Sequence, residues 1–141
     1  MIRIVMLAAL VAVTLGMTNI STTLGKGGFV AAVTVNCQYD GYEGIVNVDF
    51  YKTTGSKTTP TLPYTFAAKC SGKGSTTATT EPMLKPDSWR VLFSALTPGS
   101  SSWDCATVID GQGFPMTASL VCWSPYDDGY RSASVQISEA P

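Results

Sequence analysis

Short runs of alternating apolar and polar residues, separated by turn-forming residues, fill the chain after residue 28. Side chains of a strand alternate between the two faces of a sheet, so this period of two predicts strands with one buried face. We expect strands at 29–38, 44–52, 62–70, 88–96, 103–110, 115–124 and 130–138, with an edge strand at 75–81. We expect loops at 52–60 and 71–77, and no helix after residue 28. The sequence therefore predicts a mostly β protein, an antiparallel β-sandwich of seven or eight strands.

Two connections between these strands favour tight hairpins. A loop at residues 40–43 would place three apolar pairs side by side: Cys37 with Val46, Val35 with Val48, and Val33 with Phe50. A loop at residues 112–115 would pair Ile109 with Ala118, Thr107 with Leu120, and Cys105 with Cys122. Matching apolar partners are what a half-buried antiparallel pair requires. The pattern therefore predicts that strand 29–38 pairs with 44–52, and that 103–110 pairs with 115–124.

All four cysteines, Cys37, Cys70, Cys105 and Cys122, fall on the predicted inward face of a strand. An even number of cysteines after an export-like N-terminus indicates two disulfides and an oxidising compartment. We favour Cys37–Cys70 between strands and Cys105–Cys122 across a hairpin, although four cysteines allow three pairings. The alternative is four free thiols packed in the core.

The composition argues against an enzyme. The chain has no His, so neither a Ser-His-Asp nor a Cys-His arrangement can form, and it has no phosphate-binding or dinucleotide-binding motif. Without His or a C-x-x-C pair we expect no metal site, and we expect no cofactor. Asp49 and Asp104 are the candidates for a glycosidase carboxylate pair, but both fall on outward faces. The formal charge of −1, with scattered Lys and Arg, argues against a nucleic-acid partner.

One motif recurs, because CQYDGYEG at 37–44 and SPYDDGYRS at 124–132 each place Tyr, Asp and Gly in a predicted loop. Rigid Tyr rings and Asp carboxylates can form a contact surface, as in antibody loops. The plainer interpretation is two Asp-Gly turns flanked by Tyr. Trp123 is predicted to point outward, whereas Trp89 and Trp103 are predicted to lie in the core. The candidate binding residues are Tyr39, Asp40, Tyr42, Trp123, Tyr126, Asp127, Asp128 and Tyr130.

The chain divides into an apolar N-terminal segment with a Gly-rich hinge, residues 1–28, and a β-sandwich domain, residues 29–141. The apolar run from Ile4 to Leu15 has the length of the hydrophobic region of a secretory signal, which would be removed. It would equally suit a retained assembly helix that ends at Gly25. The assembly face would consist of Ile4, Leu7, Leu10, Val11, Leu15, Ile20 and Leu24.

Two further expectations concern this N-terminal segment. Asn19 begins the one N-glycosylation acceptor pattern of the chain, which matters only if the segment is retained. Contact with a membrane is expected only through residues 1–24.

An apolar N-terminal helix followed by a β head rich in Ser and Thr resembles the subunits of type IV pilin-like and archaeal pilin filaments. The resemblance implies that the apolar helices bundle in the filament core and that the heads form the outer sheath. The β domain is also similar in broad architecture to secreted immunoglobulin-like and fibronectin-like sandwiches. That second likeness implies an architecture and assigns no functional residue.

Charged residues make up 13% of the chain, about half the usual share, and Ser and Thr supply the remaining polar surface. This balance is typical of secreted and cell-surface β-proteins. We therefore expect a non-catalytic extracellular or cell-surface structural protein, a pilus-like filament or surface-assembly subunit that binds copies of itself. The alternative is a processed, soluble adhesion module whose Tyr-rich loops contact a protein or a glycan.

Overall fold

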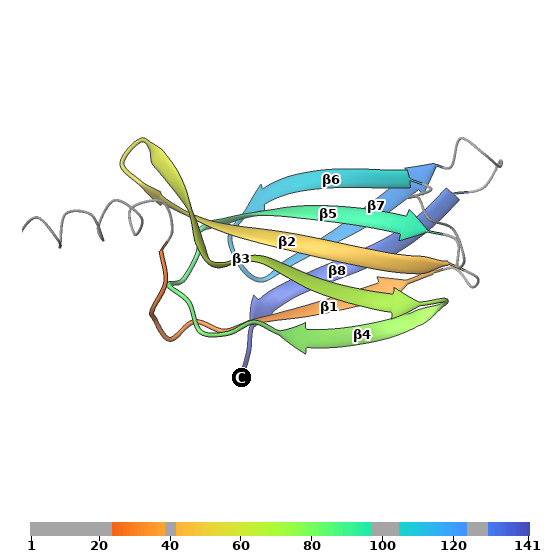
Figure 1. Ribbon diagram of the computed structural model, residues 1–141, viewed down its shortest axis with the longest axis horizontal. Coiled ribbons are helices and arrows are strands. Elements are labelled where there is room, and N and C mark those ends of the chain that lie inside the picture. Colours follow the sequence, from red (N-terminus) through yellow and green to blue (C-terminus); the bar gives the residue numbers. More distant parts are fainter. Residues whose placement is uncertain (1–23, 39–41, 97–104, 124–129) are drawn as a thin grey trace, which may run out of the picture.

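The computed structural model describes residues 24–38, 42–96, 105–123 and 130–141. These residues contain no helix and eight strands: β1 Ala31–Cys37, β2 Glu43–Thr54, β3 Lys57–Ser71, β4 Gly74–Thr79, β5 Ser88–Leu96, β6 Cys105–Gln112, β7 Met116–Trp123 and β8 Tyr130–Glu139 (Figure 1). Each strand overlaps one that the alternating pattern predicts. The prediction of a mostly β protein is therefore confirmed.

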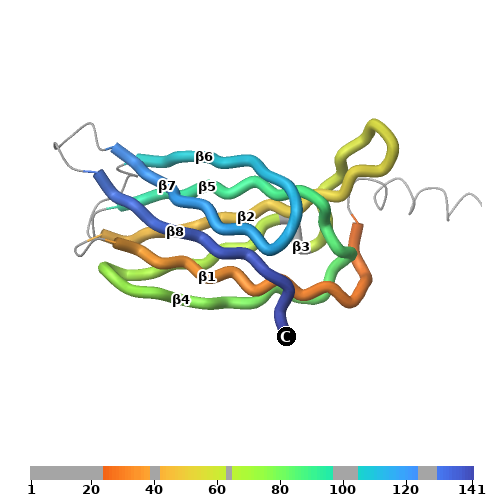
Figure 2. Tube along the Cα trace, turned by 180° about the vertical axis from the view of Figure 1, so that it is seen from behind, coloured from red at the N-terminus to blue at the C-terminus, as the bar shows by residue number. Residues whose placement is uncertain are grey.

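The strands form two antiparallel, four-stranded sheets that pack face to face. The β8 sheet has the strand order β4-β1-β8-β7, and the β2 sheet has the order β3-β2-β5-β6. The β2 sheet lies toward the viewer in Figure 1, and the β8 sheet does so in Figure 2. The core lies between them, as two layers with one apolar face each require.

The residues of β1 and β2 that the alternating pattern predicts to face inward do lie in this core. Val33 and Val35 of β1, and Val46, Val48 and Phe50 of β2, are fully buried. Removing a side chain of this size from water contributes roughly 1.5–3 kcal/mol. The inward and outward positions of these strands therefore follow the sequence pattern.

The two predicted hairpins are wrong. β1 pairs with β4 and β8, whereas β2 pairs with β3 and β5, so the connection between β1 and β2 crosses from one sheet to the other. The connection between β6 and β7 crosses in the same way, because β6 pairs with β5 and β7 pairs with β8. Apolar residues that face each other across a core satisfy the same alternation as apolar residues that lie side by side on one face.

The predicted loop at 52–60 is also wrong, because these residues form the β2–β3 hairpin. Thr54 pairs with Lys57 and Thr53 pairs with Thr58, and Gly55 adopts a φ of 64° at the turn. The β-branched Thr residues favour extended backbone, which outweighs the polarity that suggested a loop. The predicted loop at 71–77 is shorter than expected, since β4 already begins at Gly74.

Trp89 of β5 fixes the end of the sandwich near the β6–β7 connection. Its ring is buried, as predicted, and its Nε1–H donates to the Gly113 carbonyl oxygen at 3.1 Å. The ring lies against Gly111 of β6, where a Cβ atom would overlap it. Gly111 is therefore needed for this close approach of ring and backbone.

The two ends of the sandwich carry different parts of the chain. Leu24 forms a bridge with Thr61, at the end where β2 turns into β3 and where the C-terminus lies (Figure 1). Trp123, Tyr130 and Cys37 end or begin their strands at the opposite end. The predicted assembly helix is wrong at Leu24, which is extended, and the other assembly residues lie outside the described residues. Within the described ranges, no helix has the length and apolar character needed to cross a membrane.

Candidate functional site

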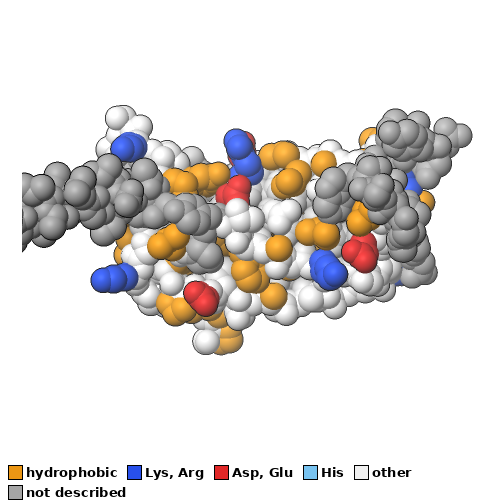
Figure 3. Space-filling model, in the orientation of Figure 1, with side chains coloured by type: hydrophobic (Ala, Val, Ile, Leu, Met, Phe, Trp, Pro, Cys, Tyr) orange, Lys and Arg blue, Asp and Glu red, His pale blue; other side chains and the backbone are white. Residues whose placement is uncertain are grey.

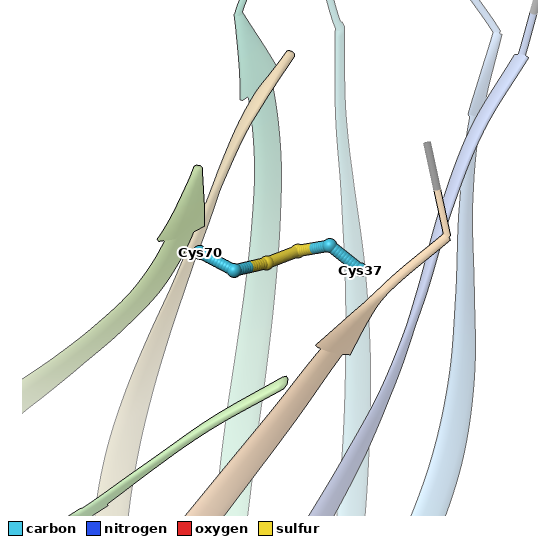
Figure 4. Close-up of a disulfide and its surroundings, with 2 residues drawn as sticks. All are labelled: Cys37 and Cys70. Carbon is cyan, nitrogen blue, oxygen red and sulfur yellow. A yellow bond between two sulfur atoms is a disulfide. The ribbon is translucent and has the colours of Figure 1, made fainter. Parts of the chain in front are cut away.

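The predicted disulfide between Cys37 and Cys70 is present and joins the two sheets. Cys37 ends β1 in the β8 sheet, and Cys70 lies one residue before the end of β3 in the β2 sheet (Figure 4). Both residues are buried, and their Cα atoms are 6.3 Å apart. The bond therefore ties the sheets together at the end that carries Trp123 and Tyr130.

The second predicted disulfide, Cys105–Cys122, is not formed in the structure, where both residues are thiols. Cys105 begins β6 and Cys122 lies on β7, so the pair also faces across the two sheets. Burial raises the pKa of the Cys122 thiol, and a hydrogen bond with Cys105 raises it further. The Cys122 thiol also donates to the Phe93 carbonyl oxygen, at 3.7 Å. The Cys122 thiol is thus held in the neutral form, which is unreactive toward electrophiles.

Arg131 is a buried cation close to this thiol pair. The Arg131 side chain is 2% exposed, and its guanidinium carbon lies 3.7 Å from the centre of the Tyr42 ring. A guanidinium stacked on an aromatic face is attracted by the ring quadrupole, most strongly where water is excluded. Tyr42, a candidate binding residue, therefore packs over Arg131 within the chain.

Trp123 and Tyr130 form an exposed aromatic pair at the end of the β7–β8 hairpin. They are direct cross-strand partners, with ring centroids 5.2 Å apart and planes tilted by 46°. Trp123 is 68% exposed and Tyr130 is 42% exposed. The outward orientation predicted for Trp123 is confirmed. Two large rings that stay in solvent, although they contact each other, form a surface suited to binding a partner.

The outward side of the β8 sheet continues from this pair through the exposed Val121 and its partner Ser132 to rows of neutral polar side chains, which we call the hydroxyl face. The strand register places one row across the sheet at Ser119, Ser134, Asn36 and Ser75. The next row consists of Thr117, Gln136, Thr34 and Thr77. The Thr34 and Thr77 hydroxyls lie 2.8 Å apart, which confirms that they share this face. Sequence reasoning missed this surface because its members come from four separate strands.

A hollow lies on the hydroxyl face beside the aromatic pair. Its volume is about 420 Å³, and it is lined by Gln38, Ser119, Tyr130, Ser132, Ala133 and Ser134. Hydroxyl and amide groups can both donate and accept hydrogen bonds. The hollow therefore places neutral hydrogen-bonding groups next to the ring of Tyr130.

The outward side of the β2 sheet differs in charge. Arg90 donates to Asp110 through Nε at 2.7 Å and Nη2 at 3.2 Å, and this hydrogen bond lowers the pKa of the Asp110 carboxyl. Asp49, one of the two candidate carboxylates, accepts a hydrogen bond from the Thr65 hydroxyl at 2.7 Å. Figure 3 shows this side of the molecule as a mixture of apolar, acidic and basic side chains. These charged side chains form hydrogen bonds with neighbouring residues of the same sheet, as ordinary solvent-exposed strand residues do.

The remaining predicted site residues lie outside the described residues. They are Asn19, Tyr39, Asp40, Trp103, Asp104, Tyr126, Asp127 and Asp128. Among the residues with described positions, no three His, Cys, Asp or Glu side chains gather as a metal site. Comparison with protein-family models, curated proteins and solved structures found no match.

Proposed function

We propose that this chain is a non-catalytic extracellular structural protein, a pilus-like filament or cell-surface assembly subunit with an immunoglobulin-like sandwich as its outward head. The observation that carries the proposal is that the two ends of the sandwich differ. Leu24 enters at one end, and Trp123 and Tyr130 stand at the other. A segment that joins copies or anchors the chain at the first end would leave the aromatic pair at the distal end.

Two further observations support an extracellular location. The Cys37–Cys70 disulfide is of a kind that persists in oxidising compartments. The surface relies on Ser and Thr in place of ions, and a low density of charge reduces repulsion between copies that pack side by side.

The test is the intact mass of the protein from its native source, combined with electron microscopy of the same material. We expect a mass that includes residues 1–24 and polymers in the images. A clean monomer that starts between residues 17 and 26 would refute the assembly role.

That refuting outcome would favour a second candidate, a processed and soluble adhesion module. The exposed Trp123–Tyr130 pair favours this candidate, since two large aromatic rings at the surface offer contact area to a protein or a glycan. Tyr42 contributes less to this surface than the sequence suggested, because Arg131 already stacks on it. Replacing Trp123 and Tyr130 together should then abolish binding without unfolding the domain.

A further inference from the structure

We infer that the hydroxyl face, together with Trp123 and Tyr130, is a binding site for a neutral polysaccharide. The inference rests on the proposed function in one respect, that the distal end of an extracellular head meets material outside the cell. It goes further by naming the surface and the chemical class of ligand, and by placing the contact on a sheet face instead of on the Tyr-Asp loops.

The aromatic pair supplies the part of the site that recognises sugar rings. A pyranose has C–H groups on its ring faces, and these pack on the face of an indole or phenol while the hydroxyls project around the edge. Trp123 and Tyr130 contact each other, with ring planes tilted by 46°, and each keeps part of its surface exposed. The exposed parts of two adjoining rings can contact successive sugars of one chain.

The hollow supplies the hydrogen bonds that a sugar needs at its edge. Gln38, Ser119, Ser132 and Ser134 line it beside Tyr130. Each of these side chains both donates and accepts, as each sugar hydroxyl does. Such mutual pairing keeps polar groups satisfied when water is displaced from the hollow.

The charge of the face selects against ionic ligands. Arg131 and Glu139 are the charged residues within β4, β1, β8 and β7. Arg131 is buried, and Glu139 is exposed at the end of β8 away from the aromatic pair, on the inward side of the register. No described outward side chain of these strands can therefore pair with a carboxylate, sulfate or phosphate of a ligand. The β2 sheet carries Arg90 and Asp110 on its outward side, so the neutrality belongs to this one face.

A second copy of the chain fits this face less well than a polysaccharide does. The cores of protein–protein interfaces are depleted in Ser and enriched in apolar anchors. Trp123, Tyr130 and Val121 are exposed anchors of that kind at one end of the face. The row through Ser119, Ser134 and Ser75, which makes up the surface beyond them, has the opposite character. The two rows extend across all four strands away from the rings, which gives a long polymer room to lie along the face.

The experiment measures binding of the full chain to uncharged glucan, mannan, xylan, galactan and chitin, with alginate as the anionic comparison. Soluble polymers are cast into native gels, and insoluble ones are used in pull-downs. The variants are Trp123→Ala, Ser119→Glu and, on the opposite sheet, Val108→Ser, whose side chain is 53% exposed. Thermal melts check that each variant folds, and sedimentation measures association of copies.

We expect at least one neutral polymer to slow the migration of the protein in the native gel or to retain it in the pull-down. Trp123→Ala should weaken that binding about tenfold or more, as loss of a central aromatic contact does. Ser119→Glu should also weaken it, because it places a charge in the hollow, while Val108→Ser should bind normally.

Three results would overturn the inference: no binding to any neutral polymer, binding to alginate alone, or neutral binding that Trp123→Ala leaves intact. Self-association that Trp123→Ala abolishes, without polysaccharide binding, would identify a second copy as the occupant. None of these results bears on whether residues 1–24 are retained, so the proposed function is tested separately.

Discussion

Removing the Cys37–Cys70 disulfide should cost this domain a large part of its stability. The bond closes a loop with a sequence separation of 33 residues. A cross-link limits the unfolded chain, and the loop-entropy relation gives about 3.7 kcal/mol for a loop of this length at 25 °C. A domain of this size is stable by roughly 5–15 kcal/mol, so the loss is a substantial fraction of the total.

The assay is urea unfolding of the oxidised wild type beside the Cys37→Ala, Cys70→Ala double variant, followed by far-UV circular dichroism. We expect the double variant to unfold at a lower urea concentration and to melt about 15 °C lower. A Cys105→Ala, Cys122→Ala variant is the matched control, since it removes two inward thiols that no disulfide joins. A loss below about 1 kcal/mol on removing the bridge would refute the reasoning, because loop closure would then contribute little.

Three other predictions follow from local packing and ionisation. Gly111→Ala should destabilise the domain by about 1–3 kcal/mol, because its Cβ atom overlaps the Trp89 ring, whereas Gly28→Ala, with open space around it, should not; urea unfolding measures both. The Cys122 pKa is raised on folding, so the free energy of unfolding should stay constant below the thiol's ordinary pKa of 9.0 and fall as pH rises above it. For the same reason, alkylation of the Cys122 thiol in the native protein at pH 8 should be slow until urea is added. Asp87→Ala should cost about 1 kcal/mol in the same unfolding assay, because the carboxylate accepts a backbone N–H of β2 at 3.0 and 3.1 Å; an unchanged midpoint would contradict this.

The existence of the strands was predictable because each strand carries its own alternation. Val33 and Val35 show which side of β1 is buried, and that information lies within a few consecutive residues. Pairing is different, since it depends on which other strand lies alongside. Val35 would be buried whether Val48 lay beside it in the same sheet or opposite it in the other sheet. The alternating pattern therefore could not distinguish a β1–β2 hairpin from a connection that crosses between sheets.

The β2–β3 hairpin was missed for another reason. Residues 52–60 contain Lys, Thr, Gly, Ser and Pro, and this polarity suggested a loop. A hairpin that extends beyond the core needs no apolar face, and Thr favours the extended backbone in solvent. The Thr53 and Thr58 hydroxyls, 3.2 Å apart, mark the cross-strand contact that the linear pattern does not reveal.

The candidate site was predictable only at its aromatic part. The position of Trp123, next to the inward Cys122, indicated that it faces outward. The hydroxyl face was not predictable, since single Ser and Thr residues on a strand are ordinary surface residues. Ser119, Ser134 and Asn36 form a row only through the register of β7, β8 and β1, which is long-range information.

The lengthwise opposition of Leu24 and Tyr130 has a mechanical consequence. A pull between these residues runs along β8 and passes into β1 across their shared ladder, from Cys37↔Ala133 to Ala31↔Glu139. The hydrogen bonds of an antiparallel ladder are perpendicular to the strands, so this tension shears them together and cannot open them one after another. A domain pulled between these two ends would therefore resist force more strongly than one whose strands are peeled apart from a single end.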